Sequence, residues 1–318
     1  MAEPLIQTIG LKKFFDIDKK TKLHAVDGVD LAIHKGTTLG VVGESGCGKT
    51  TLGRTVLGLL RATDGKIIYS GKDITHVTGK EYAQLRQEMQ IIFQDPYSSI
   101  NPRHSIKKTI GEPLLVNKII RNKKERESKV LELMETVGLA SRFADSYPHE
   151  LDGGRRQRVG IARALAVNPR FIVCDEPVSA LDVSIQAQVL NLLMDLQDQM
   201  GLTYMFITHD LSVVRHISTE IAVMYLGQCI ERAPAKELFS HPLHPYTQAL
   251  ISAIPVPNAS AREKKAEIIK GELTSPINPK PGCRFASRCP YAEPRCTGAD
   301  LPLQEVSPGH YIACTLHQ

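Results

Sequence analysis

The sequence has no long hydrophobic run and little excess charge. The first absence argues against a membrane-spanning protein, and the second gives no indication of nucleic-acid binding. None of its apolar stretches approaches the roughly 18 uninterrupted residues that a membrane-spanning helix needs. The N-terminal residues lack the basic start and apolar stretch of a secretion signal, so we expect a cytoplasmic chain. A net charge of +5 over 318 residues is too small to indicate nucleic-acid binding by itself.

The overall composition is typical of a globular protein. Hydrophobic residues make up 42% of the chain and charged residues 23%, which excludes collagen-like, disordered and coiled-coil proteins. A chain of 318 residues can form one large domain or two smaller ones with a substantial core.

Short apolar runs alternate with longer stretches of helical spacing, which predicts an α/β fold with a mainly parallel sheet. We expect a helix over residues 184–199 and a helical insert, with a charged face, between about 100 and 150, for instance at 123–137. Five prolines between residues 234 and 257 predict a linker that leads to an appended tail. Buried strands are predicted at residues 39–42, 67–69, 89–93, 171–174, 204–207 and 221–225.

A phosphate-binding motif follows the first of these predicted strands. Residues 43–50, Gly-Glu-Ser-Gly-Cys-Gly-Lys-Thr, fit the pattern GxxxxGK(S/T) between a strand and a helix. Its glycines let backbone N–H groups surround a phosphate, and the helix N-terminus adds its positive end. Lys49 would reach the β and γ phosphates, and the Thr50 hydroxyl would bind Mg²⁺. The residues predicted to contact the nucleotide here are Gly43, Ser45, Gly46, Cys47, Gly48, Lys49, Thr50 and Thr51.

Two carboxylates end another apolar strand, as a nucleoside triphosphatase requires. Asp175 and Glu176 directly follow the apolar residues 171–174. We expect Asp175 to hold Mg²⁺ through its water shell and Glu176 to act as the general base that polarises the attacking water.

With these two motifs in this order, the sequence resembles the ATP-binding subunits of ABC transporters over about residues 5–255. Gln94, in Ile-Ile-Phe-Gln-Asp-Pro, matches the Q-loop glutamine, which in that family touches the metal and the attacking water and couples to the membrane subunits. Asp182, in Ser-Ala-Leu-Asp, matches the D-loop. His209, in Ile-Thr-His-Asp, matches the switch histidine that contacts the γ-phosphate.

The family also places an aromatic residue near the start of the chain, where its ring stacks on adenine. We assign this role to Phe15, in Leu-Lys-Lys-Phe-Phe, with Phe14 as the alternative. A flat apolar surface is needed because the phosphate-binding loop holds only the phosphate tail.

Two further segments resemble the subgroup that powers oligopeptide and dipeptide importers. Residues 95–103, Asp-Pro-Tyr-Ser-Ser-Ile-Asn-Pro-Arg, continue the Q-loop and are expected to face the permease. Residues 244–250, His-Pro-Tyr-Thr-Gln-Ala-Leu, are also typical of that subgroup. Nickel importers share much of this pattern, so a nickel importer or another importer remains the alternative.

The signature loop departs from the family pattern. The family has Leu-Ser-Gly-Gly-Gln, whereas this chain has Asp152 for the serine, then Gly153 and Gly154, and Arg155 for the glutamine. An ionised Asp152 only accepts hydrogen bonds and brings like charge toward a triphosphate. Arg155 or Arg156 would partly neutralise that charge. We therefore expect a heterodimer with asymmetric sites, in which a partner supplies a normal signature loop.

Seven cysteines in a cytoplasmic chain are not expected to form structural disulfides. Cys47, Cys174 and Cys229 are expected to be small buried hydrophobic residues. The other four have the spacing C-x5-C-x6-C-x17-C, and four thiolates suit either tetrahedral zinc or a 4Fe-4S cluster. The wide spacing favours iron–sulfur, which the importer subgroup's C-terminal extension often carries, in a structural role. The predicted cluster ligands are Cys283, Cys289, Cys296 and Cys314.

The resemblance implies an ABC ATPase fold with a mainly parallel sheet, an antiparallel β subdomain, a helical subdomain at about 97–165 and a C-terminal extension over 256–318. It also implies ATP and Mg²⁺ as ligands. The partners expected are a second ATPase subunit, two transmembrane permease subunits and, indirectly, a substrate-binding protein, at the cytoplasmic face of the membrane.

Two other classes of ATPase are alternatives to a transporter subunit, and the sequence favours neither of them. A soluble ABC ATPase of DNA repair or of ribosomes would carry long coiled coils or two fused ATPase domains, and this chain has neither, so no nucleic-acid partner is expected. The cysteine-containing tail also leaves a metal-sensing or iron–sulfur assembly ATPase open.

Overall fold

The computed structural model describes residues 3–254 and 275–317, and the chain divides into two compact units. Of the described residues, the first unit comprises 3–34, 38–76, 208–254 and 275–317, and the second comprises 35–37 and 77–207. The expected boundary between an ATPase domain ending at 255 and an extension beginning at 256 lies outside the described residues.

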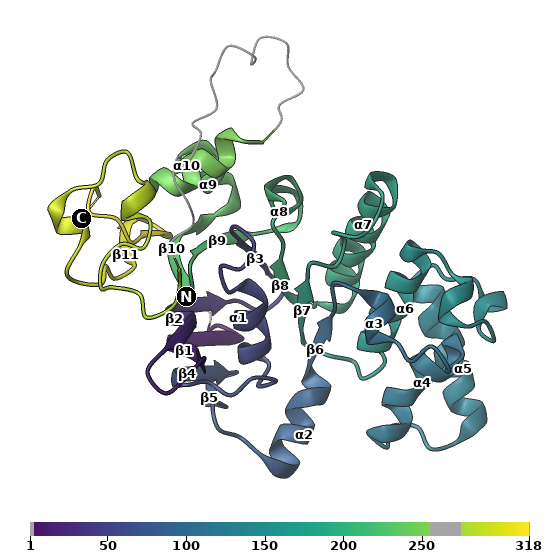
Figure 1. The fold of residues 1–318 in the computed structure, drawn as a ribbon. Coiled ribbons are helices and arrows are strands. Elements are labelled where there is room, and N and C mark those ends of the chain that lie inside the picture. Colours follow the sequence, from purple (N-terminus) through teal and green to yellow (C-terminus); the bar gives the residue numbers. More distant parts are fainter. Residues whose placement is uncertain (1–2, 255–274, 318) are drawn as a thin grey trace, which may run out of the picture. The chain divides into compact units, whose positions relative to one another are not determined.

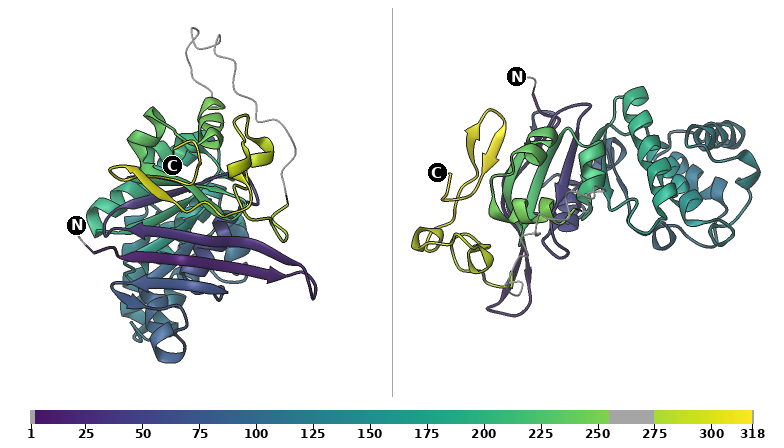
Figure 2. Two further views of the ribbon diagram at one scale, coloured as in Figure 1. Left: turned by 90° about the vertical axis from the view of Figure 1, so that its left-hand side faces the viewer. Right: turned by 90° about the horizontal axis from the view of Figure 1, so that it is seen from above.

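The first unit contains a four-stranded antiparallel sheet in the order β2-β1-β4-β5, and its long strands β1 and β2 are seen side by side in the left panel of Figure 2. The pairing of β1 with β2 has three register shifts, between Thr8 and Phe14. Such bulges bend a strand and interrupt its alternation of buried and exposed side chains. The strands are β1 (Ile6–Asp16), β2 (Lys22–Ile33), β4 (Asp64–Tyr69) and β5 (Lys72–Asp73).

A second group of strands in the first unit lies in the order β11-β12-β10-β9-β3. Here β3 and β9 are parallel and the other neighbours are antiparallel. Every residue of β3 is buried, as expected for the apolar run at 39–42. The strands are β3 (Thr38–Val42), β9 (Glu220–Tyr225), β10 (Gln228–Pro234), β11 (Gln304–Ser307) and β12 (His310–Ile312). The helices are α1 (Lys49–Val56), α8 (Leu211–Ile217), α9 (Ala235–Ser240) and α10 (Pro245–Ser252).

The second unit combines three parallel strands with a helical region, as Figure 1 shows. Its strands, β6 (Met89–Ile92), β7 (Phe171–Asp175) and β8 (Thr203–Ile207), pair in the order β8-β7-β6. Helices α4 and α5 pack against each other and on α6. The helices are α2 (Gly79–Glu88), α3 (Pro96–Ser99), α4 (Ile106–Val116), α5 (Lys123–Thr136), α6 (Gly153–Leu165) and α7 (Val183–Met200), with 3-10 turns at Ser141–Phe143 and Pro148–Glu150.

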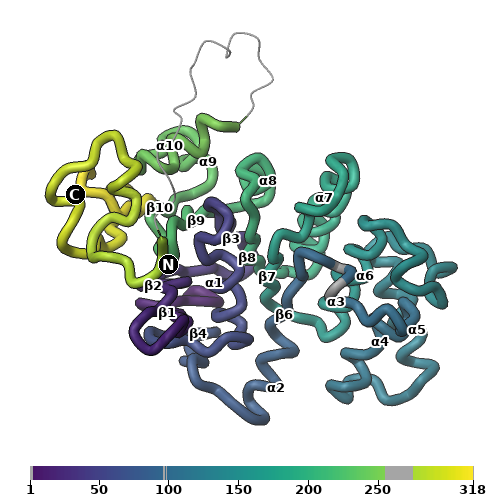
Figure 3. Tube along the Cα trace, in the orientation of Figure 1, coloured from purple at the N-terminus to yellow at the C-terminus, as the bar shows by residue number. Residues whose placement is uncertain are grey.

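The C-terminal residues 275–317 lie beside β10 and β2 of the first unit, and their path can be followed in yellow in Figure 3. Ile277 forms an antiparallel bridge with Leu23 of β2, and Phe285 is buried in the same core as Tyr225 and Tyr246. The tail is therefore packed on the first unit and shares its core. Two 3-10 turns, Ala286–Arg288 and Pro294–Cys296, shape its chain.

The structure confirms the predicted fold class, with parallel strands, an antiparallel sheet and a helical region. Each predicted strand coincides with an observed one, and the predicted helices at 184–199 and 123–137 correspond to α7 and α5. None of the helices in the described residues is both long and apolar enough to cross a bilayer.

Candidate functional site

The phosphate-binding loop connects β3 to α1 in the first unit, where the sequence predicted it. Gly48 caps α1 with φ +103°, and a Cβ there would lie 1.9 Å from the Ala25 carbonyl oxygen, so no other residue fits. Lys49 is buried, and its Nζ donates to the carbonyls of Gly43 (2.8 Å) and Glu44 (2.9 Å). The lysine charge and the first amides of α1 therefore lie together at the end of the loop, an arrangement suited to binding an anion.

The remaining loop residues differ in exposure. Ser45 and Gly46 are exposed, and Thr50 and Thr51 are half-buried in the first turn of α1. Cys47 is buried, and burial raises the pKa of its thiol, so this residue is inert. Cys174 and Cys229 are also buried, as expected of small hydrophobic side chains.

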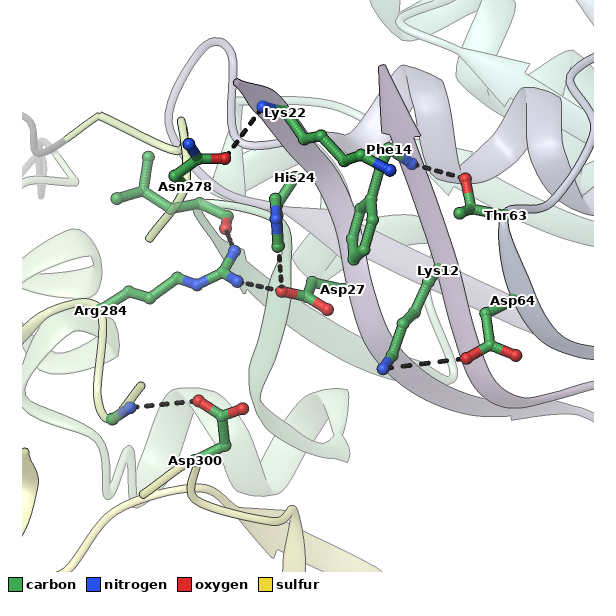
Figure 4. A network of polar contacts seen from close by, with 12 residues as sticks. Lys12, Phe14, Lys22, His24, Asp27, Thr63, Asp64, Asn278, Arg284 and Asp300 are labelled. Carbon is green, nitrogen blue, oxygen red and sulfur yellow. Dashed lines mark hydrogen bonds and ion pairs between the residues drawn. The ribbon is translucent and has the colours of Figure 1, made fainter. Parts of the chain in front are cut away.

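The two candidate aromatic residues, Phe14 and Phe15, are neighbours on β1 and therefore point to opposite faces of the strand. The Phe14 ring stacks on His24 with centroids 3.8 Å apart, and Figure 4 shows the two residues on adjacent strands. The Lys13 ammonium lies 4.8 Å from the centroid of the Phe15 ring. The choice of Phe15 over Phe14 stays a prediction.

The carboxylates predicted for catalysis lie in the second unit, at the end of β7. Asp175 is buried, and Glu176 follows it with φ +48°, a sparsely populated conformation for a residue with a side chain. The Glu176 amide donates to the Ile207 carbonyl at 2.9 Å. The Gln94 side-chain amide donates to the Glu176 carboxylate at 2.9 Å. The structure thus brings together Gln94 and Glu176, both of which were expected to act on the attacking water.

The signature loop begins α6, and Asp152 is the N-cap of that helix. Its Oδ1 accepts the Arg155 N–H at 2.7 Å, and its Oδ2 lies 3.0 Å from the Arg155 guanidinium. Arg156 instead donates to the Pro148 carbonyl. Of the two arginines considered for neutralising Asp152, Arg155 is the one whose guanidinium pairs with the Asp152 carboxylate.

The signature glycines lie against the D-loop within the second unit. A Cβ on Gly154 would be 2.5 Å from Ile185, and one on Gly153 would be 3.1 Å from Leu181. Asp182 is the N-cap residue of α7. A methyl group on Gly154 would force Ile185 to shift, whereas one on Gly153 would require only a small movement of the Leu181 side chain.

His209 lies in the first unit and is exposed just before α8. The preceding Thr208 is buried, and its amide donates to the Val41 carbonyl at 3.2 Å. Asp210 caps α8 by accepting the Ser212 N–H. The predicted switch histidine is therefore an exposed residue that directly follows a backbone segment hydrogen-bonded to β3.

The four tail cysteines line one cavity of about 10 Å³, room for about one water molecule. Burial raises the pKa of Cys283 to about 11, and it also raises the pKa of Cys289 and Cys314, with the neighbouring thiols adding to the shift. Among the described residues, no group of three or more His, Cys, Asp or Glu side chains is placed to hold a metal ion. The thiols are gathered, but they do not form a coordination shell as they stand.

A histidine of the 244–250 segment lines the same cavity. His244 is buried, burial lowers its pKa to about 4, and its Nδ1 accepts the Tyr246 N–H. The proton of the neutral ring is therefore on Nε2, which has no hydrogen-bond partner in the described part of the chain. An acceptor such as a sulfide or thiolate would satisfy this donor, so the donor set suits a sulfur-rich group.

The sequence did not reveal how closely the tail approaches the phosphate-binding loop. The Tyr246 hydroxyl accepts the Glu44 N–H at 2.9 Å, and Arg288 forms an ion pair with the Glu44 carboxylate. The motif at 244–250 indicated only a subgroup. Nothing in the sequence around Arg288 predicted its ion pair with Glu44, which lies 244 residues away along the chain.

Comparison with known proteins agrees with these features. The family described as "ABC transporter" matches residues 26–179, and the family "Oligopeptide/dipeptide transporter, C-terminal region" matches residues 230–296. The oligopeptide transport ATP-binding protein AppF of Bacillus subtilis (strain 168) is 48% identical over 323 residues, which cover 99% of this chain and 98% of AppF. The dipeptide transport ATP-binding protein DppF of Haemophilus influenzae is 48% identical over 316 residues, 98% of this chain and 96% of DppF.

A solved structure is similar as well. A dimeric ATP-binding cassette in a post-hydrolysis state, bound to ADP and Pi, aligns with a TM-score of 0.65 and 27% identity over 72% of this chain and 98% of the cassette. The phosphate-binding loop, the Gln94–Glu176 contact and near-complete coverage by relatives lead to one conclusion. The chain belongs to the ABC transporter family, among the ATP-binding proteins of oligopeptide and dipeptide transport.

Proposed function

We propose that this chain binds and hydrolyses MgATP to power the uptake of dipeptides or oligopeptides across the cytoplasmic membrane. The observation that carries the proposal is similarity over nearly the whole chain, tail included, to ATP-binding proteins of peptide transport. The tail matters because the ATPase motifs alone are common to many kinds of ABC protein.

In this proposal each predicted site residue has one role at the bound nucleotide. Lys49 and the amides of α1 bind the phosphates, and Phe15 supports the adenine. The oxygen donors Thr50 and Asp175, with Gln94, suit Mg²⁺, which when bound neutralises phosphate oxygens. Glu176 takes the proton of the attacking water, Gln94 orients Glu176, and His209 contacts the γ-phosphate.

A second ATPase subunit completes the working site. The signature loop at 152–154 and Asp182 of the D-loop would face the nucleotide held by that partner, as expected for ABC dimers. Because Asp152 already pairs with Arg155 and lacks the serine hydroxyl, this loop would bind a γ-phosphate poorly. This favours a heterodimer with asymmetric sites.

The dimer would sit on two permease subunits at the cytoplasmic face of the membrane, as a peripheral protein that receives peptides from a substrate-binding protein. Residues 95–103, which directly follow Gln94, are the proposed permease contact. The absence of a membrane-spanning helix in the described residues is compatible with peripheral attachment.

We also propose that Cys283, Cys289, Cys296 and Cys314 bind a 4Fe-4S cluster in a structural role, with zinc as the alternative. Four thiols around one cavity and the buried Nε2–H of His244 support it. Because the cavity is small, the thiols must move from the positions described here to accept either group.

Co-purification and transport test the proposal together. Affinity-tagged chain should co-purify with hydrophobic permease subunits, and deletion of its gene should abolish uptake of a radiolabelled dipeptide. Complementation by the unchanged gene should restore uptake, whereas a Lys49→Ala gene should not. Loss of nickel uptake with normal peptide uptake would favour the alternative importer, and absence of any permease partner would contradict transport altogether.

A further inference from the structure

Two arginines between the first two tail cysteines reach the phosphate-binding region of the same unit. Arg284 and Arg288 lie in residues 283–289, Cys-Arg-Phe-Ala-Ser-Arg-Cys. Their side chains are only 5% and 8% exposed. Buried arginines require charged partners, and both have one outside the tail.

Arg288 holds the Glu44 carboxylate in a two-pronged ion pair. Its Nη1 donates to Glu44 Oε2 at 3.0 Å, and its Nη2 donates to Oε1 at 3.2 Å. Nη1 also donates to the Tyr225 hydroxyl at 3.2 Å. A bidentate pair of this kind fixes orientation as well as charge.

Glu44 is the second residue of the phosphate-binding loop, and contacts hold it at three points. The carboxylate is held by Arg288, the amide donates to the Tyr246 hydroxyl at 2.9 Å, and the carbonyl accepts Lys49 Nζ at 2.9 Å. The position of Glu44 therefore affects the lysine that is proposed to bind the phosphates.

Arg284 reaches a different part of the same region. Its guanidinium pairs with Asp27 and donates to the Leu226 carbonyl. Asp27 Oδ2 lies 2.8 Å from His24 Nδ1, and Figure 4 shows this chain of contacts beside Phe14. The tail segment thus contacts the surroundings of both the phosphate-binding loop and the candidate adenine-binding strand.

Phe285, between the two arginines, anchors the segment. It is 1% exposed, and its ring packs edge-on against Tyr225 and Tyr246, both with centroids 5.4 Å away. Because Phe285 is part of the core of the first unit, the arginines on either side are held in place.

We propose that Arg288 is a positioning residue of the nucleotide site, which makes tail residues 283–289 a structural part of the phosphate-binding loop. This inference rests on the proposed ATPase function. Without Arg288, the half-buried Glu44 carboxylate would lose its charged partner beside the phosphates. The charge would repel the triphosphate, and the loop would lose its fixed geometry.

Equilibrium binding of a fluorescent ATP analogue to the full-length chain tests this. Arg288→Gln should weaken binding about tenfold, the size expected for losing a charge-assisted pair. Adding Glu44→Gln to that variant should recover much of the loss, because the repelling charge is then gone. Arg288→Lys, which keeps the charge without the two-pronged geometry, should give an intermediate affinity. In turnover assays KM for ATP should rise more than kcat falls.

Arg295→Gln is the matched control, since exposed Arg295 pairs only with Glu293 of the tail among the contacts described. It should bind ATP as the unchanged chain does. Equal binding by Arg288→Gln, or no recovery in the double variant, would overturn the inference. If Arg288→Gln does not fold, the affinity of Arg288→Lys decides, and an unchanged value overturns it. Failure of the unchanged chain to bind the analogue would instead contradict the ATPase proposal.

Discussion

The side-chain amide of Gln94 donates a hydrogen bond to the Glu176 carboxylate, with 2.9 Å between Nε2 and Oε2. Gln94 leads directly into residues 95–103, the segment proposed to contact the permease. Glu176 has φ +48°, a backbone conformation that is sparsely populated for a residue with a side chain. In the proposed function, movement of the 95–103 segment would reach Glu176, the proposed general base, through this one hydrogen bond.

Glu176→Gln should bind ATP but nearly stop hydrolysis. The amide keeps an acceptor for Gln94 but cannot take a proton, so kcat should fall by about 100- to 10,000-fold. Nucleotide binding and single-turnover hydrolysis measure the two effects separately. Asp198→Asn removes an exposed carboxylate of α7 as a control and should be neutral. Normal turnover by Glu176→Gln would exclude this residue as the base.

Phe15→Ala should reduce affinity for ATP roughly tenfold while leaving affinity for tripolyphosphate unchanged, because stacking involves only the base. Phe14→Ala is the matched comparison, and it also removes the stack on His24. Competition binding with both ligands distinguishes the two residues. A selective loss in Phe14→Ala alone would show that the alternative assignment is right.

Asp152→Ser should raise the ATPase rate of the assembled transporter, since serine restores the hydroxyl donor and still caps α6. Asp152→Asn removes the charge and keeps a cap, so it should give a smaller increase. Steady-state hydrolysis with the partner subunit present measures both. An unchanged rate in Asp152→Ser would count against asymmetric sites.

Anaerobically purified protein should contain about four irons and matching sulfide per chain, the content of a cubane cluster. Cys289→Ser should lower that content, because it removes one of the four thiols around the cavity. Cys229→Ser, at a buried cysteine outside this group, is the control. Metal and sulfide analysis measures these contents. Zinc without sulfide would contradict the iron–sulfur cluster and support a zinc site instead.

Most of the fold could be predicted from the sequence because its parallel strands are continuous apolar runs. β3, β7 and β8 are buried at every position, so they stand out against their surroundings. β1 is harder to recognise, because register shifts between Thr8 and Phe14 break its alternation. β11 has exposed side chains throughout and therefore gives no hydrophobic signal.

The phosphate-binding loop was predictable because its function depends on residues adjacent in sequence. The contacts that support the loop could not be predicted in this way. Arg288 and Tyr246 reach Glu44 across about 200 residues or more of chain, and only tertiary packing brings them there. The sequence could predict which residues bind the phosphates, but not which residues hold the loop in place.

ATP hydrolysis by this chain is proposed to power peptide uptake. The most direct test is uptake of a radiolabelled dipeptide into proteoliposomes that contain the assembled transporter, its binding protein and MgATP on the ATPase side. We predict uptake that requires ATP and is lost when this chain carries Glu176→Gln. Peptide uptake that proceeds without ATP, or that is unaffected by Glu176→Gln, would contradict the account.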